Sequence, residues 1–210
     1  MPYRLVPLVN ENYYHIFNRG VEKRTVFLTG HDYKRFLNTL IYYQIEESNV
    51  KFSSRSLLNI ISAQNSKKQV EIIGYCLMPN HYHLLLKQNI DNGISTLLRK
   101  VSNSYTKYFN TKHERVGPLF QGAFKARLIE NNEALLHVLR YIHLNPFVDG
   151  SDQVLDLSYP YSSYGEYVNK QRICNTRIAK ELLVGQDFSA FHKDQIEYAR
   201  EIKSAMHFDK

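Results

Sequence analysis

Apolar side chains recur with helical spacing in three stretches of the chain, and each stretch is predicted to form an amphipathic helix. The stretches are residues 31–43, 93–110 and 132–144. In the third, Asn132 is suited to be the N-cap, and Pro146 is expected to end the helix. Because Asn145 precedes this proline, its backbone is expected to leave the helix.

β-Favouring residues fill four other stretches, which are predicted to be strands. The first is YYHIFNRG at residues 13–20, and the fourth lies within GPLFQGAFKARLI at residues 117–129. The second and third, VEIIGYCLM and HYHLLLKQ, flank Pro79-Asn80. Proline suits the second position of a tight turn and asparagine the third, so these two strands are predicted to form a β-hairpin.

The predicted order is strand, helix, strand, strand, helix, strand, helix. A hairpin between strand–helix units predicts an α+β fold, with an antiparallel sheet of the ferredoxin-like kind and flanking helices. Residues 49–68 are rich in Ser, Asn and Lys, and are predicted to be a variable insertion. Residues 1–150 are predicted to form one domain. Residues 151–210, with YPYSSYGEY and a charged tail, are predicted to be a C-terminal extension.

Composition narrows the class of protein. The chain has 210 residues, of which 43% are hydrophobic, and no apolar run long enough for a membrane span. Its N-terminal stretch does not resemble a signal peptide, and its two cysteines are far apart, so a cytoplasmic location is expected. The formal charge of +7 favours a polyanionic partner such as nucleic acid.

Two histidines stand in the third predicted strand, in MPNHYHLLL. Strand side chains alternate between faces, so His81 and His83 are expected on one face and Tyr82 on the other. Two imidazoles placed in this way can converge on a metal ion. The plainer alternative is that both are ordinary buried histidines.

A metal site needs a third ligand, and two candidates stay open. In a two-residue hairpin Cys76 pairs with His83, which would allow a Cys/His/His zinc site. The second candidate lies in the last helix, where His137, Tyr141 and Asn145 recur every four residues and share one face.

A tyrosine beside a metal held by imidazoles and an amide oxygen suggests phosphoryl transfer, with Tyr141 as the nucleophile. The reference pKa of tyrosine is about 10, so its deprotonation needs help, for which His137 is a candidate base. An amide oxygen ligand favours Mg²⁺ or Mn²⁺ over zinc.

These segments together resemble a known family. MPNHYHLLL resembles the HUH motif, and LRYIHLNP resembles the catalytic helix of the single-tyrosine HUH transposases of minimal insertion sequences, the IS200-like superfamily. YHIFNRGVEKR, GPLFQGAFKARLI and YPYSSYGEY resemble the REP-associated tyrosine transposases in that group. The resemblance extends over roughly residues 8–167.

The resemblance implies a ferredoxin-like (RRM-like) HUH core and a metal-dependent enzyme that nicks and rejoins single-stranded DNA. It implies His81, His83 and Asn145 as metal ligands and Tyr141 as the nucleophile, which forms a 5′-phosphotyrosine. The implied partner is single-stranded DNA with hairpin or palindromic repeats. A homodimer also stays open, since relatives in minimal insertion sequences are dimers and REP-associated relatives can act as monomers.

Basic residues gather between positions 97 and 129, where seven Lys or Arg accompany one acidic residue. Aromatic residues are interleaved with them, a composition typical of nucleic-acid contacts. Lys125 and Arg127 are expected near the active site. The predicted DNA-binding residues are Arg19, Arg24, Arg99, Lys107, Lys125 and Arg127.

Three alternatives remain. Tyr105 and Tyr108 are the main rivals to Tyr141 as nucleophile. The chain could instead be a hairpin DNA- or RNA-binding protein without catalysis. A zinc hydrolase that uses Cys76, His81 and His83 is the third.

Overall fold

The computed structural model describes residues 6–45, 52, 67–148, 159–169, 173–185 and 187–193. Its centre is one antiparallel sheet of four strands in the order β2-β3-β1-β4. The strands are β1 (Tyr13–Arg19), β2 (Val70–Met78), β3 (His81–Gln88) and β4 (Lys125–Ile129). This arrangement confirms the predicted α+β fold with an antiparallel, ferredoxin-like sheet.

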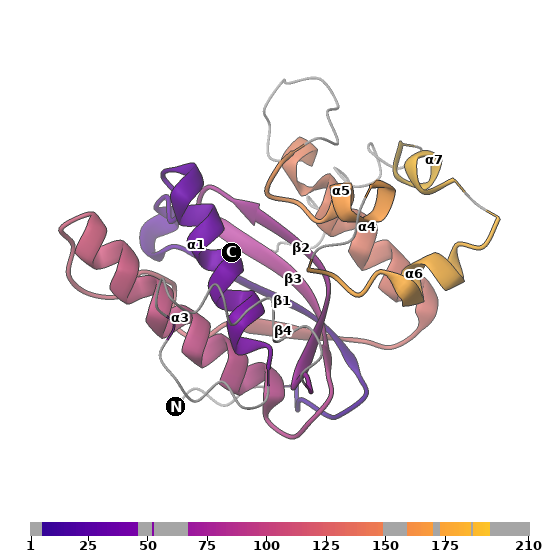
Figure 1. Cartoon of the computed structure of the whole chain (residues 1–210), viewed down its shortest axis with the longest axis horizontal. Helices are drawn as coiled ribbons and strands as arrows, with labels where there is room; N and C mark the ends of the chain where they lie inside the picture. Colours follow the sequence, from indigo (N-terminus) through magenta and orange to yellow (C-terminus); the bar gives the residue numbers. More distant parts are fainter. Residues whose placement is uncertain are drawn as a thin grey trace.

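Helices cover both faces of the sheet (Figure 1). On one side lie α1 (Gly30–Tyr43) and α3 (Gly93–Lys112), which pack against each other. On the other side lies α4 (Asn132–Val148), with the short helices α5 (Tyr164–Val168), α6 (Arg177–Leu182) and α7 (Phe188–Lys193). A 3₁₀ turn, η1 (Val21–Lys23), follows β1.

The predicted hairpin is confirmed in its register. Met78 pairs with His81, and Cys76 pairs with His83, on either side of Pro79-Asn80. The loop after β1 holds this turn in place, since the N–H groups of Val26 and Phe27 both donate to the Pro79 carbonyl.

Alternation along the strands gives the sheet two apolar cores. Tyr14, Ile16, Tyr82 and Leu84 pack on the side of α1 and α3. Cys76, Met78, Leu85 and Ile129 pack on the other side, against Leu135, Leu139 and Ile142 of α4. The strand therefore points neighbouring residues into different environments, as its period of two requires.

The last helix differs from its prediction at both ends. Its N-cap is Asn131 and not Asn132, because the Asn131 side chain accepts a hydrogen bond from the Ala134 N–H at 2.8 Å. Pro146 lies inside α4, and the helix continues to Val148. A proline in the last turn removes only one backbone donor, so it does not end the helix at once. Asn145 therefore stays helical, contrary to the prediction.

Residues after the core cover an edge of the sheet. The Leu77 N–H donates to the Tyr161 carbonyl at 3.0 Å, and the Ser163 N–H donates to the Tyr75 carbonyl at 2.9 Å. These bonds satisfy backbone groups of β2 that would otherwise form an open edge. The domain boundary near residue 150 stays a prediction.

The predicted insertion at residues 49–68 lies outside the described residues, apart from positions 52, 67 and 68. Phe52 is buried against α1, where its ring lies 5.4 Å from that of Tyr42. None of the helices in the described part of the chain combines the length and the apolar character needed to cross a membrane.

Candidate active site

His81 and His83 point from β3 toward the face of the sheet that α4 covers. Both are buried, and their ring centroids lie 5.1 Å apart at 89°. Tyr82 points to the opposite face and contacts Phe36 of α1, at 5.1 Å between ring centroids. The pair therefore shares one face, as the sequence predicts.

Helix α4 brings Tyr141 and Asn145 to the same place. Oδ1 of Asn145 lies 3.2 Å from Nε2 of His81. The Tyr141 ring lies 5.5 Å from the His83 ring, edge to face at 86°. All four side chains are buried at 8% exposure or less. Leu139 and Ile142 pack α4 against the sheet, so Tyr141 and Asn145 lie beside the histidine pair.

The contacts of Asn80 assign the proton of His81. Asn80 Nδ2 donates to the Lys23 carbonyl at 3.3 Å, so Asn80 Oδ1 faces His81 Nδ1, 2.6 Å away. An amide oxygen only accepts, so His81 Nδ1 carries the hydrogen. In the neutral ring Nε2 then holds a lone pair directed at Asn145 Oδ1, which is also an acceptor. Two acceptors that face each other in this way suit a cation between them.

His15 of β1 is a site residue that the sequence analysis missed. Its Nε2 lies 2.9 Å from Nδ1 of His83, and its ring lies 5.9 Å from that of Tyr141. Burial, with the nearby charge of Arg127, lowers the pKa of His15 to about 3, so it is neutral at pH 7. The two imidazoles can share one hydrogen, and if His83 donates it, the Nε2 atom of His83 keeps a lone pair.

The donor set suits a divalent ion. Ligand atoms at right angles around an ion with bonds of 2.0–2.1 Å lie about 3 Å apart, close to the separation of His81 Nε2 and Asn145 Oδ1. Asn80 and His15 support the two imidazoles through their Nδ1 atoms, as outer hydrogen-bond partners of metal-bound histidines do. His81, His83 and Asn145 therefore fit the predicted ion.

The alternative site with Cys76 is not formed. Cys76 pairs with His83 across the hairpin, but its Sγ lies 3.8 Å from Sδ of Met78, within the apolar core under α4. Within the described ranges, no group of three or more His, Cys, Asp or Glu residues is arranged to hold a metal ion. The described residues therefore do not support the alternative of a Cys/His/His zinc site.

His137 lies one turn before Tyr141 on α4 and is partly exposed. Its Nδ1 accepts from the Arg140 guanidinium at 2.9 Å, and its Nε2 faces a Glu133 carboxylate oxygen at 3.5 Å. Both ring nitrogens are thus engaged along their own helix. A role as base requires His137 to exchange one of these contacts, and it stays a prediction.

Three of the predicted DNA-binding residues surround the histidine face. Arg19 pairs with His81 across β1 and β3, and Lys125 and Arg127 of β4 pair with Phe17 and His15. Paired residues project to the same side of a sheet. Lys125 and Arg127 are exposed, and Lys125 Nζ lies 5.9 Å from the Phe17 ring.

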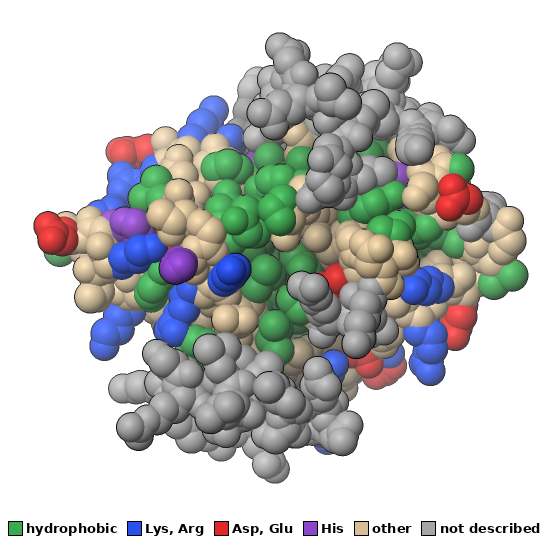
Figure 2. Space-filling model, turned by 45° about the horizontal axis from the view of Figure 1, so that its top comes forward, with side chains coloured by type: hydrophobic (Ala, Val, Ile, Leu, Met, Phe, Trp, Pro, Cys, Tyr) green, Lys and Arg blue, Asp and Glu red, His purple; other side chains and the backbone are tan. Residues whose placement is uncertain are grey.

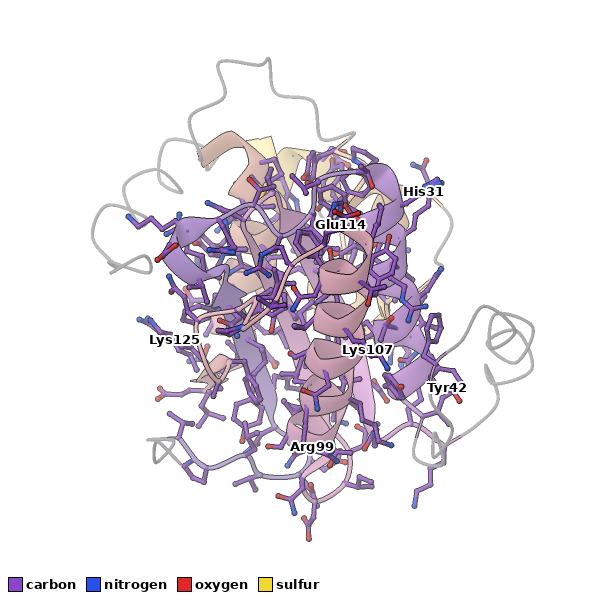
Figure 3. All side chains as sticks on the ribbon, turned by 90° about the vertical axis from the view of Figure 1, so that its left-hand side faces the viewer. His31, Tyr42, Arg99, Lys107, Glu114 and Lys125 are labelled. Carbon is purple, nitrogen blue, oxygen red and sulfur yellow. The ribbon has the colours of Figure 1, made fainter. Side chains whose placement is uncertain are left out.

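The other three lie elsewhere. Arg24 follows η1 and forms an ion pair with Glu22 at 3.2 Å. Arg99 and Lys107 project from the exposed side of α3, in the helical layer across the sheet from α4 (Figures 1 and 3). The basic residues that the sequence places together therefore divide between the two faces of the molecule.

The rival tyrosines also lie across the sheet. Tyr105 is fully buried, donates to the Val26 carbonyl at 2.5 Å, and has a pKa that burial raises. Tyr108 donates to Asp32 Oδ1 at 3.0 Å, and burial raises its pKa too. The Tyr105 hydroxyl thus contacts the loop before α1, and the Tyr108 hydroxyl links α3 to α1.

Comparison with known proteins bears on both fold and family. The family model described as "Transposase IS200 like" matches residues 8–145, more than half of the chain. No curated protein matches this chain. A solved structure of a REP-associated tyrosine transposase bound to a REP hairpin has a similar fold, with a TM-score of 0.57 and 18% sequence identity. The match covers 80% of this chain and 86% of the other.

Proposed function

Because this chain belongs to the family of IS200-like transposases, we propose that it cuts and rejoins single-stranded DNA through a covalent bond to Tyr141. One observation carries the proposal. Tyr141 and Asn145 of α4 meet His81 and His83 of β3 on one buried face. In that arrangement a nucleophile lies beside nitrogen and oxygen atoms that suit a metal ion, and such an ion can bind phosphate.

In the proposed step the Tyr141 oxygen attacks the phosphorus of a DNA phosphodiester. The bond from phosphorus to the 3′ oxygen breaks as the new bond forms, which leaves a 5′-phosphotyrosine and a 3′-hydroxyl. The tyrosine proton passes to a base, for which His137 is the candidate, and the departing oxygen takes up a proton. Attack by a second 3′-hydroxyl reverses the step, so rejoining needs no ATP.

His81, His83 and Asn145 are the proposed ligands of Mg²⁺ or Mn²⁺, which would polarise a phosphate oxygen and orient the phosphorus. His15 and Asn80 contact Nδ1 of His83 and of His81, so the Nε2 atoms are the proposed ligand atoms. Arg19, Lys125 and Arg127 are proposed to contact the DNA backbone beside this site, and Arg24 to contact it beyond the hairpin turn.

The proposed substrate is single-stranded DNA that carries hairpin or palindromic repeats. The family match and the hairpin in the structure of the similar REP-associated transposase support it. Residues 1–150 are proposed as the transposase domain and residues 151–210 as its extension. A homodimer and a cytoplasmic location stay proposals.

The test is a covalent adduct assay. Labelled single-stranded hairpins from the DNA beside the gene are incubated with the full chain and Mn²⁺ or Mg²⁺, then separated on a denaturing gel. The expected result is a metal-dependent protein–DNA band that Tyr141→Phe abolishes and that His81→Ala/His83→Ala reduces by at least about 100-fold. An adduct that survives Tyr141→Phe would refute the nucleophile. Tight hairpin binding without any adduct would instead favour a non-catalytic binding protein.

A further inference from the structure

A serine–histidine network, made of Ser163, His143 and His192, crosses the junction between α4 and the short C-terminal helices. Ser163 Oγ lies 2.8 Å from His143 Nε2, and His143 Nδ1 lies 3.0 Å from His192 Nε2. His192 Nδ1 lies 2.8 Å from the carbonyl oxygen of Phe188. All three side chains are buried. On the right of Figure 2, the side that these helices occupy in Figure 1, hydrophobic side chains show between the charged ones.

The Phe188 carbonyl assigns the hydrogens of the network. A carbonyl oxygen only accepts, so His192 Nδ1 carries a hydrogen. Burial lowers the pKa of His192 to about 4 and that of His143 well below its usual range, so both rings are neutral at pH 7. A neutral imidazole has one donor and one acceptor. His192 Nε2 therefore accepts from His143 Nδ1, and His143 Nε2 accepts from the Ser163 hydroxyl.

Ser163 fixes one end of the network to the sheet. Its N–H donates to the Tyr75 carbonyl and its Oγ accepts from the Tyr75 N–H, both at 2.9 Å. Its hydroxyl lies nearer to His143 Nε2, at 2.8 Å, than to the Tyr75 carbonyl, at 3.2 Å. A serine beside a histidine pair is also found in activated nucleophiles, but Ser163 is fully buried, out of reach of a substrate. The network is therefore suited to hold α4 between β2 and α7.

Tyr141 and His143 lie on opposite sides of the apolar stripe of α4. Ile142 packs in the core between α4 and the sheet. Successive residues of a helix are about 100° apart, so Tyr141 and His143 project to either side of Ile142. Apolar packing is not directional, so the contacts of Ile142 alone leave the rotation of α4 about its axis loosely set. Hydrogen bonds depend on direction, and those of His143 restrict this rotation.

A small rotation of α4 would disturb the candidate active site. Side-chain tips lie about 5–6 Å from a helix axis, so a turn of about 10° moves them by about 1 Å. A misplacement of about 1 Å in a reacting group can cost roughly 100-fold in rate. Asn145 Oδ1 would move with Tyr141, and its separation of 3.2 Å from His81 Nε2 would change.

We propose that the serine–histidine network positions the helix that carries the nucleophile. By setting the rotation of α4, it holds Tyr141 and Asn145 against the histidine pair of β3. This inference rests on the proposed function. It gives the segment YPYSSYGEY, which supplies Ser163, a part in the reaction although it lies outside the site.

The test compares two substitutions of His192 in the full chain. His192→Gln keeps an acceptor for His143 Nδ1 and a donor for the Phe188 carbonyl, whereas His192→Leu keeps neither. Both variants lose the ring contacts of His192 with Tyr164 and Phe188. A difference between the variants therefore reports the hydrogen bonds of the network and not the loss of the imidazole ring.

The first measurement needs neither metal nor DNA. ¹⁵N NMR of the histidine rings is recorded in EDTA, well below the unfolding temperature of each variant. The His81 ring nitrogens are expected to shift in His192→Leu, because Asn145 Oδ1 moves relative to His81 Nε2. In His192→Gln they should keep their wild-type positions. Identical His81 resonances in the two variants would overturn the proposal, whatever the reaction shows.

The second measurement is the rate of covalent adduct formation at several DNA concentrations. At saturating DNA, His192→Leu is expected to react about 10- to 100-fold more slowly than the wild type, and His192→Gln within about 3-fold of it. The DNA concentration at half saturation should change by less than about 2-fold in both, since the proposed DNA contacts lie outside α4. Equal rates in the two variants would contradict positioning of Tyr141.

The two measurements separate this proposal from that of Tyr141 chemistry. If the wild type forms no adduct but His81 shifts only in His192→Leu, the network positions α4 and the proposed reaction fails. If the wild type forms the adduct and the two variants match each other in both measurements, the proposed reaction stands and the positioning role is refuted.

Discussion

At the scale of single residues, the motif MPNHYH contributes more than its two histidines. Asn80 accepts from His81 Nδ1 at 2.6 Å, and its own amide nitrogen is oriented by the Lys23 carbonyl. The residue before the first histidine therefore decides which ring nitrogen carries the lone pair. His15 has the corresponding place beside His83 Nδ1, at 2.9 Å.

Asn80→Ala is expected to weaken Mn²⁺ binding about 10- to 100-fold, because His81 loses the acceptor that fixes its tautomer. The measurement is calorimetric titration with Mn²⁺, accompanied by ¹⁵N NMR of the histidine tautomers. Asn80→Asp keeps an acceptor and should restore most of the affinity. Equal Mn²⁺ affinity in Asn80→Ala and the wild type would show that Asn80 has no positioning role.

At the scale of elements, the edge of β2 is held by a segment from the C-terminal part of the chain. Ser163 exchanges two bonds with Tyr75, because its N–H donates to the Tyr75 carbonyl and its Oγ accepts from the Tyr75 N–H, both at 2.9 Å. Ser163 Oγ also lies 2.8 Å from Nε2 of His143 on α4. One serine therefore links a strand edge to the helix that carries Tyr141.

Ser163→Ala is expected to lower the free energy of unfolding by about 1–3 kcal/mol, since the buried Tyr75 N–H loses its acceptor. Urea unfolding measures the change. Ser162→Ala is the matched control, because among the described residues Ser162 Oγ accepts a weaker hydrogen bond, from the Tyr164 N–H in the same turn at 3.3 Å. The control should cost less than about 1 kcal/mol. A Ser163→Ala variant as stable as its control would contradict the proposed link.

At the scale of the whole molecule, the sheet separates two kinds of surface. The face under α4 carries the histidine pair, Tyr141 and Asn145, while the layer of α1 and α3 carries a basic groove. Of the three candidate nucleophiles, Tyr105, Tyr108 and Tyr141, only Tyr141 lies with the predicted metal ligands. Position relative to the sheet therefore distinguishes the candidate nucleophiles.

Tyr105→Phe and Tyr108→Phe are accordingly expected to form the covalent adduct at the level of the wild type. Tyr105→Phe should still cost about 1 kcal/mol of stability, because the Val26 carbonyl loses its donor. Adduct yield is measured well below the unfolding temperature of each variant. A yield that falls in either variant while its fold is intact would place that tyrosine in the reaction.

Local sequence patterns determined the secondary structure of this protein and the register of its hairpin. The periods of the apolar residues located the strands and helices, and Pro79-Asn80 set the hairpin register that places His81 and His83 on one face. These features depend on neighbours in the chain, so a sequence carries them directly. The error in the predicted end of α4 also has a local cause. A proline removes one hydrogen-bond donor, but the helix can continue past it.

Only the tertiary structure decided which distant residues meet. No sequence spacing relates His15 to His83, because their contact depends on the pairing of β1 with β3 and on burial under α4. The basic segment from Leu97 to Ile129 is continuous in sequence, but its chain turns from α3 to β4 and so supplies both faces of the molecule. Sequence fixes what each element can offer, whereas packing decides which side chains share a site, because contacts between elements form through space.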